Sequence, residues 1–137
     1  MGKDLRVAVC LDDGGGMLFA GRRQSRDRDL ISELCEATDG EIFITDFSSF
    51  IFREHQGKTV ITKNPFEDAP DGATLFIENL PISPYEDLID ELILYKWNRA
   101  YPADSKIDID LTKYKVVAKK EFPGSSHEKI TKLRLKK

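Results

Sequence analysis

The sequence is poor in the residues that build metal centres and disulfides. Its 137 residues include two cysteines, two histidines and one tryptophan. Cys10 and Cys35 each lie among apolar neighbours, which is typical of buried, reduced thiols in an intracellular protein. A chain of this length can bury roughly two-thirds of the surface that its unfolded form exposes. It therefore needs neither a metal ion nor a disulfide to hold a core together.

Long apolar runs and an excess of positive charge are also missing. No run approaches the ~18 residues that span a membrane, and the N-terminus has neither the apolar segment of a signal peptide nor a myristoylation motif. We therefore expect a cytoplasmic protein. The formal net charge of −3 disfavours nucleic acid and anionic membranes as partners. With 40% hydrophobic and 33% charged residues, the composition is that of one globular domain over residues 1–137.

The first half of the sequence alternates between strand and helix patterns. Residues 5–11 are almost continuously apolar, which predicts a central strand covered on both faces, and residues 12–16 predict a flexible turn. A helix follows, which Ser25 or Asp27 could cap and Gly40 could end. Its predicted apolar face comprises Leu30, Ile31, Leu34 and Cys35. Strands are predicted over 41–45, 59–62 and 74–77, a short helix or turn over 47–52, and a loop over 66–72.

The second half predicts one more helix and a terminal hairpin. Ser83 as N-cap, Pro84 at the first helical position and Glu86 as the capping-box acid mark a helix start. The apolar face of this helix would comprise Tyr85, Leu88, Ile89 and Leu92. A strand is predicted over 92–97, and a hairpin over 114–118 and 129–135. This order predicts an α/β fold with a mainly parallel central sheet flanked by helices and a C-terminal antiparallel β-hairpin.

This layout resembles the dihydrofolate reductase fold over most of the chain. Residues 5–13 look like the first strand and acidic turn of that family, and Gly16-Met17 stands where its flexible active-site loop begins. Asp29-Leu30 stands where the family places its substrate-binding carboxylate. Residues 92–95, 103–104, 114–117 and 121–123 resemble its later strands, acidic turn and final hairpin. The resemblance implies a shortened and divergent dihydrofolate reductase-like protein with Asp29 as its candidate catalytic residue.

The departures from that family concern its cofactor, NADPH. The segment that holds cofactor phosphates with an arginine reads Thr45-Asp46-Phe47-Ser48 here, and the glycine pair that lets the backbone approach the pyrophosphate reads Glu78-Asn79. Two acids repel a dinucleotide, and a side chain in place of glycine blocks its close approach. The chain is also shorter than members of that family usually are, and the missing residues would fall between residues 63 and 73, on the cofactor side. We therefore expect the fold to persist without NADPH and without another cofactor.

The sequence also resembles short bacterial proteins labelled ribonuclease Z, but its residues do not support that label. A zinc-dependent nuclease of that kind binds two zinc ions through clustered histidines and acids. His55 and His127 are far apart and form no His-x-His motif. We therefore expect no metal site.

An arginine-rich segment is the first candidate site. Arg22, Arg23, Arg26 and Arg28 could bind a carboxylate or phosphate beside a helix N-terminus, or could form a solvated face that only caps the helix. Asp29 could be a buried carboxylate that acts as an acid or anchors a heterocycle. Its alternative is an acid at the helix start that the helix dipole stabilises.

Two further segments suggest ligand contacts. Trp97, flanked by Lys96 and Arg99, could stack on a planar ligand or a base, or could pack against the edge of the core. The Gly124-Ser125-Ser126-His127 segment predicts a turn whose amides could cradle an anion. Neighbouring serine and histidine side chains in an extended segment point to opposite faces, so this segment predicts no catalytic pair.

We expect a reductase-like protein that has lost NADPH binding and holds a small anionic or heterocyclic ligand, or a protein partner, in a cleft. One alternative is a small NAD(P)H-dependent reductase of the dihydrofolate reductase type. A second alternative is a nucleic-acid-associated module, which the net charge disfavours. The expected ligand-binding residues are Met17, Arg22, Arg23, Arg26, Ser48, Tyr95 and Trp97.

Overall fold

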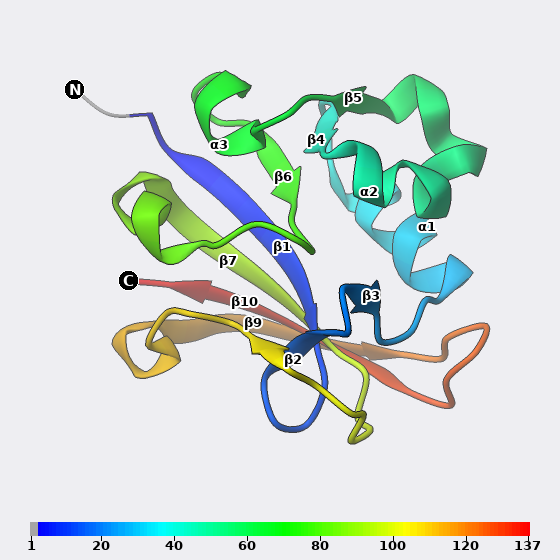
Figure 1. Ribbon diagram of the computed structural model, residues 1–137. Helices are drawn as coiled ribbons and strands as arrows, with labels where there is room; N and C mark the ends of the chain where they lie inside the picture. Colours follow the sequence, from blue (N-terminus) through cyan, green and yellow to red (C-terminus); the bar gives the residue numbers. More distant parts are fainter. Residues whose placement is uncertain (1–2) are drawn as a thin grey trace.

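The computed structural model describes residues 3–137, and within this range a twisted seven-stranded sheet forms the centre of the molecule (Figure 1). Its strand order is β5-β4-β6-β1-β7-β10-β9. The first five strands of this order run parallel, and β10 runs antiparallel to both of its neighbours. The strands are β1 (Leu5–Leu11), β4 (Ile42–Ile44), β5 (Thr59–Ile61), β6 (Thr74–Phe76), β7 (Ile89–Lys96), β9 (Lys115–Phe122) and β10 (Ile130–Lys136). The predicted α/β fold with its C-terminal antiparallel hairpin is confirmed.

A small second sheet covers one end of the large one, and the sequence analysis did not predict it. It has the order β3-β2-β8, and its strands are β2 (Gly16–Phe19), β3 (Arg22–Arg23) and β8 (Ser105–Lys106). Ala20 and Gly21 connect β2 to β3 with φ values of 53° and 72°, as the tightest hairpin turns require. Strands of two to four residues are too short to show an alternating pattern.

Helical segments cover both faces of the large sheet. Successive side chains of a strand point to opposite faces, so Val7 and Val9 of β1 belong to one apolar cluster while Ala8 belongs to the other. Leu30 and Leu34 pack on the Ala8 face, together with residues of the helical segment that follows β4. The helical segments are α1 (Arg28–Ala37), α2 (Asp46–Ser49), α3 (Pro65–Asp68) and the 3-10 helices η1 (Phe50–Lys58), η2 (Ser83–Leu88) and η3 (Leu111–Lys113). The helix face predicted from Leu30, Ile31, Leu34 and Cys35 is confirmed.

The predicted second long helix is wrong. A 3-10 helix ends at Leu88, and β7 begins at Ile89. Residues 89–96 find backbone partners in β1 on one side and β10 on the other, and this pairing outweighs the local signals for a helix. Ser83 does not cap η2 with its side chain, and its backbone N–H instead donates to Asp108.

Two smaller predictions are also wrong. Helix α1 ends before Gly40, because Thr38 adopts an extended conformation and its hydroxyl donates to the Leu34 carbonyl oxygen. The loop predicted over 66–72 contains most of α3, which Asn64 caps and which has proline at its first turn. The sequence Asn64-Pro65 is a helix start that was interpreted only as a strand end.

Both cysteines are free thiols, Cys10 half-buried and Cys35 buried. Burial raises the pKa of Cys35 to about 11. In the part of the chain that the structure describes, no helix is long and apolar enough to cross a membrane.

Two valines allow a matched test of the core. Val9 in β1 is 0% exposed, whereas Val117 in β9 is 53% exposed. We expect Val9→Ala to lower the free energy of unfolding by about 2–3 kcal/mol, because it removes buried methyl groups and leaves a cavity. Val117→Ala should change it by less than about 0.5 kcal/mol. Urea denaturation of both variants measures the difference, and equal effects would contradict the described burial.

Candidate functional site

A buried carboxylate at the start of α1 organises the site. Asp27 has an extended backbone, and its Oδ1 accepts from the backbone N–H groups of Asp29 at 3.0 Å and Leu30 at 3.2 Å. It therefore caps the helix, which confirms one of the two predicted caps. Its side chain is 0% exposed, so each carboxylate oxygen has to find donors within the protein.

The remaining donors to Asp27 come from the connection between β9 and β10. The backbone N–H groups of Ser125 and Ser126 donate to it at 3.0 and 2.8 Å, and the Ser125 hydroxyl donates at 3.1 Å. His127 Nδ1 lies 3.0 Å from Asp27 Oδ2. Burial by itself would raise the pKa of Asp27, but the hydrogen bonds from His127, the serine amides and Leu30 outweigh it and lower the pKa to about 2. Asp27 is thus a permanently charged anchor at neutral pH.

The second ring nitrogen of His127, Nε2, extends this chain of polar contacts. It lies 3.1 Å from Ser25 Oγ and 3.0 Å from the Tyr101 hydroxyl. The Trp97 ring stacks on the imidazole with 4.6 Å between centroids and 23° between planes. His127 and Trp97 are buried, whereas Ser25 and Tyr101 are half-buried. In the neutral imidazole, the carboxylate beside Nδ1 favours the proton on that nitrogen, and Nε2 is then the acceptor.

Gly124 allows this close packing of the β9–β10 connection against α1. A Cβ atom at position 124 would collide with the Asp27 carboxylate and would lie 2.9 Å from Ile130 Cδ1. Glycine is required here for space, because the backbone passes directly over the buried carboxylate.

A second buried carboxylate holds the turn after β1. Asp12 Oδ1 accepts from the backbone N–H groups of Gly14 at 2.9 Å and Gly16 at 2.7 Å. Its Oδ2 accepts from the Tyr101 backbone N–H at 3.1 Å. Burial raises the pKa of Asp12, but these hydrogen bonds outweigh it and lower the pKa below its ordinary value. The glycine-rich sequence predicts a flexible turn here, but these hydrogen bonds hold the turn in one conformation and connect it to the backbone at Tyr101.

An ion pair fills the cleft at the end of β1 and β6. Arg23 contacts both oxygens of Glu78 at 2.7 Å and donates to the Phe47 carbonyl oxygen at 2.9 Å. The Ser48 hydroxyl also donates to Glu78, at 2.7 Å. The cavity that remains beside this pair has a volume of only about 10 Å³. Three of the expected ligand-binding residues, Met17, Arg23 and Trp97, line this cavity, but protein side chains fill most of the space around them.

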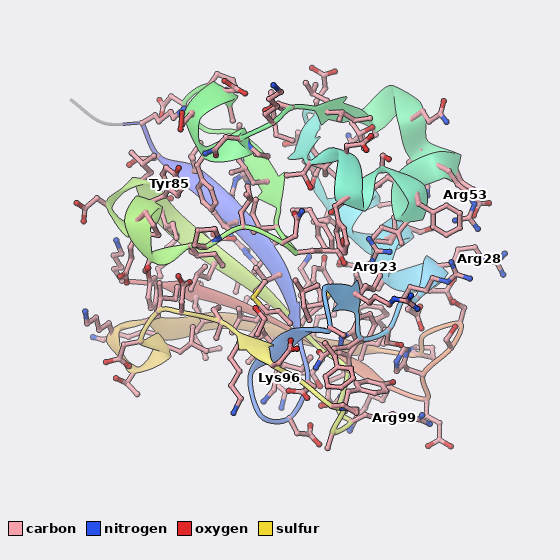
Figure 2. All side chains as sticks on the ribbon, viewed as in Figure 1. Arg23, Arg28, Arg53, Tyr85, Lys96 and Arg99 are labelled. Atoms are coloured by element: carbon pink, nitrogen blue, oxygen red, sulfur yellow. The ribbon has the colours of Figure 1, made fainter. Side chains whose placement is uncertain are left out.

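A larger cavity of about 220 Å³ opens between α1, η1 and the β9–β10 connection. Arg26, Arg28 and Arg53 line it, and Figure 2 shows Arg28 and Arg53 on the same side of the molecule. Within residues 3–137, none of these three arginines lies within 4.0 Å of a carboxylate oxygen. The other lining residues are Asp27, Ile31, Ile51, Glu54, His55, Ser125 and Ser126.

A shallow groove of about 430 Å³ adjoins this cavity on the other side of Arg26. Arg22, Arg23 and Ser25 line it together with Gly21 and Phe47. The expected ligand-binding arginines therefore divide between two neighbouring surfaces, and Arg26 borders both. Arg22 and Arg26 are exposed, whereas Arg23 is held by Glu78.

Asp29 and Tyr95 lie elsewhere than expected. Asp29 is exposed in the first turn of α1, which contradicts the first of its two interpretations, a buried carboxylate, and agrees with the second, an acid at the helix start. The buried carboxylate is Asp27. Tyr95 is fully buried and lines none of the cavities described above. Its hydroxyl donates to Glu33 at 2.5 Å, and burial together with this carboxylate raises the pKa of Tyr95.

The sequence analysis missed the contacts of His127. It compared this histidine with the adjacent serines, whereas its partners are Asp27 and Ser25, about 100 positions earlier in the chain. The sequence shows an aspartate that can cap a helix and, about 100 residues later, a glycine-serine turn. Neither pattern indicates that the two segments are in contact. No group of three or more potential metal ligands occurs among residues 3–137.

The fold and these sites define an α/β protein with a parallel sheet core, an ion-paired cleft and an arginine-lined cavity beside its first helix. No protein-family model matches the chain, and no curated protein sequence matches it. Among solved structures, it is similar to a dihydrofolate reductase from Enterococcus faecalis in complex with NADP(H) and RAB-propyl. The TM-score is 0.69 at 12% identity, and the alignment covers 96% of this chain and 95% of that one. The chain therefore has a divergent dihydrofolate reductase-like fold, as the sequence resemblance implied.

The low pKa of Asp27 makes a prediction about acid stability. A carboxylate whose pKa falls from 3.8 in the unfolded chain to about 2 in the folded protein stabilises the fold above pH ~5 by about 2 kcal/mol. This stabilisation is lost as the pH falls towards 2. The difference in unfolding free energy between the wild type and Asp27→Asn should therefore shrink by about 1.6 kcal/mol between pH 6 and pH 2.5, the larger part of the full contribution.

Urea denaturation followed by Trp97 fluorescence measures this difference. Other carboxylates with a lowered pKa, such as Asp12 and Glu33, are present in both proteins and cancel. A difference that stays constant across this pH range would contradict the described hydrogen bonds to Asp27.

Proposed function

We propose that the protein binds a small anionic ligand, a carboxylate or phosphate on a compact ring or chain, in the cavity between α1, η1 and the β9–β10 connection. The observation that supports this proposal is the convergence of Arg26, Arg28 and Arg53 on one cavity, where none of them lies within 4.0 Å of a carboxylate oxygen of residues 3–137. Like charges held together repel one another, and an anion that contacts two or more guanidinium groups relieves that repulsion through charge-assisted hydrogen bonds.

The surroundings of the arginines favour a ligand with an apolar part. Ile31 and Ile51 contribute apolar surface to the cavity. The exposed Phe50 ring lies 4.2 Å from the Arg53 guanidinium carbon and 5.2 Å from that of Arg26, and such stacking holds guanidinium groups in a defined orientation. Asp27 also lines the cavity, but its oxygens already accept hydrogen bonds from protein donors.

The residues at the end of β6 support the inference that the phosphates of a dinucleotide do not bind here. Glu78 and Arg23 fill this position as a closed pair, and the Asn79 side chain contacts Thr45. Arg23 neutralises the charge of Glu78, so a dinucleotide would be excluded here mainly by the bulk of the two side chains. Asp46 adds an exposed negative charge beside them. We therefore propose that the protein does not use NADPH, and we assign it no reductase step.

Trp97 does not support a role in nucleic-acid binding. Its ring is 4% exposed and stacks on His127, so it offers no open face to a base. One protein of known structure with a similar fold, the dihydrofolate reductase described above, is in complex with NADP(H). Dinucleotide binding is therefore the alternative that the experiment has to separate from small-anion binding.

We expect benzoate and inorganic phosphate, titrated at low ionic strength, to raise the melting temperature of the wild-type protein, because a ligand that binds only the folded state stabilises it. Arg53→Gln removes one charge-assisted contact, which is worth about 1.5–3 kcal/mol, and should weaken binding by about 10- to 100-fold. Isothermal titration calorimetry measures both affinities.

Arg99→Gln is the matched control, since it removes the same charge from an exposed residue that does not line the cavity. This variant should bind both anions as the wild type does. Equal losses in the two variants, or no binding of either anion at low salt, would refute the proposal. NADPH should cause no quenching of Trp97 fluorescence, and NADPH oxidation with dihydrofolate would show that the reductase alternative is the correct one.

A further inference from the structure

We propose that Ser25, His127 and Asp27 form a nucleophilic site that hydrolyses esters with an acidic acyl group. This proposal goes beyond anion binding, because it assigns a reaction to a separate set of side chains. It stands on the hydrogen-bonded chain from Asp27 through His127 to Ser25 and on the groove into which Ser25 opens.

The geometry has the three relations that such chemistry requires. Ser25 Oγ lies 3.1 Å from His127 Nε2, which is within reach for proton transfer. His127 Nδ1 lies 3.0 Å from Asp27 Oδ2, so the imidazole is oriented by a buried charge. Asp27 in turn is fixed by the amides of Leu30, Ser125 and Ser126. Ser25 and His127 would be the catalytic residues, and Asp27 a positioning residue.

The environment of the imidazole favours its role as a base. His127 is 5% exposed and lies between the Trp97 ring, which stacks on it, and Tyr101, whose ring packs at its edge. These contacts leave the imidazole no other orientation, which preserves the alignment of Nε2 with Ser25. The half-buried Ser25 lines both the small ion-paired cavity and the open groove, so a substrate in the groove would lie beside this residue.

The reaction is an acyl transfer in two steps. Ser25 Oγ attacks the ester carbonyl carbon, and its proton passes to His127 Nε2. The ester C–O bond then breaks, and the leaving alcohol takes the proton from Nε2. Water attacks the acyl group on Ser25 in the second step, gives one proton to Nε2 and releases the carboxylic acid, and the proton returns to Ser25 Oγ.

Tyr101 is placed to stabilise the charge that develops on the carbonyl oxygen. Its hydroxyl lies 3.5 Å from Ser25 Oγ and 3.0 Å from His127 Nε2. Nε2 of the neutral imidazole has one lone pair, so Ser25 can pass its proton to it once the Tyr101 O–H donates to the carbonyl oxygen of the substrate instead, where it stabilises the oxyanion. Its backbone N–H is held by Asp12, which keeps the hydroxyl in place.

The groove beside Ser25 indicates the substrate class. Arg22 and Arg26 line it without a carboxylate partner among residues 3–137, and Phe47 adds an apolar wall. An acyl chain that ends in a carboxylate would place its charge near these arginines while its ester carbonyl lies at Ser25. The geometry therefore points to monoesters of dicarboxylic acids rather than to neutral esters.

A fluorophosphonate probe tests the nucleophile. Ser25 Oγ should attack the phosphorus atom, fluoride should leave, and peptide mass spectrometry should find the adduct on Ser25. His127→Gln should slow labelling by at least about 100-fold, because general-base catalysis contributes at least that factor. Circular dichroism and thermal unfolding of the same samples show whether the variant is folded.

Ser32 is an internal control in the same protein. Its hydroxyl lies 3.5 Å from His55 Nε2, but His55 has no carboxylate within 4.0 Å among residues 3–137, so this pair lacks the positioning acid. We expect no adduct on Ser32. Failure of folded wild-type protein to form an adduct on Ser25, or equal labelling of Ser32, would overturn the proposal whether or not the His127 variant folds.

Two 4-nitrophenyl esters test the substrate class. Mono-4-nitrophenyl adipate should be hydrolysed at least about tenfold faster than 4-nitrophenyl hexanoate, and Arg22→Gln should reduce this ratio. Equal rates would overturn the acidic-acyl assignment. Arg99→Gln, at an exposed residue that lines neither the cavity nor the groove, should leave both labelling of Ser25 and phosphate binding unchanged. Labelling and phosphate binding are separate measurements on the wild-type protein, so the failure of either proposal can be recognised separately.

Discussion

The rest of the structure depends on the need to satisfy one desolvated carboxylate. A charged group that has lost its water must accept hydrogen bonds from the protein, or folding becomes unfavourable. Asp27 meets this need with donors from two distant segments, the first turn of α1 and the connection between β9 and β10. The position of His127 follows from this requirement, and the contacts of Ser25, Tyr101 and Trp97 with the imidazole follow in turn.

The ion pair of Arg23 and Glu78 has a complementary effect, because it closes the cleft at the centre of the sheet. Two hydrogen bonds from Arg23 and one from the Ser48 hydroxyl to Glu78 stabilise the closed arrangement of this pair. The accessible surfaces therefore lie outside this pair, along the first helix and the small sheet. A fold shared with an oxidoreductase can host different chemistry when its central cleft is filled and its periphery is not.

The sequence predicted those features that depend on local patterns. Continuous apolar character predicted β1, and 3.6-residue periodicity predicted the buried face of α1. It failed where long-range pairing decides the outcome: residues 89–92 have helical spacing but lie between β1 and β10. It left open whether Asp29 is a buried carboxylate or an acid at the helix start, because only the contact with residues 125–127 distinguishes Asp27 as the buried one. The cavity arginines were predicted in part, since Arg26 and Arg28 belong to one segment, whereas Arg53 reaches the same cavity from η1.

The place of β10 in the sheet bears on how the chain folds during synthesis. This strand is the last in sequence, yet it lies inside the sheet between β7 and β9. Translation delivers N-terminal residues first, so β7 and β9 leave the ribosome before the strand that separates them. Until β10 arrives, β7 has an unpaired edge and the donors of residues 125–127 are not fixed above Asp27. The nascent chain can form the β1–β6 pairing early, but the hydrogen-bonded chain around His127 can be completed only after residues 125–127 have been synthesised and β10 has paired with β7.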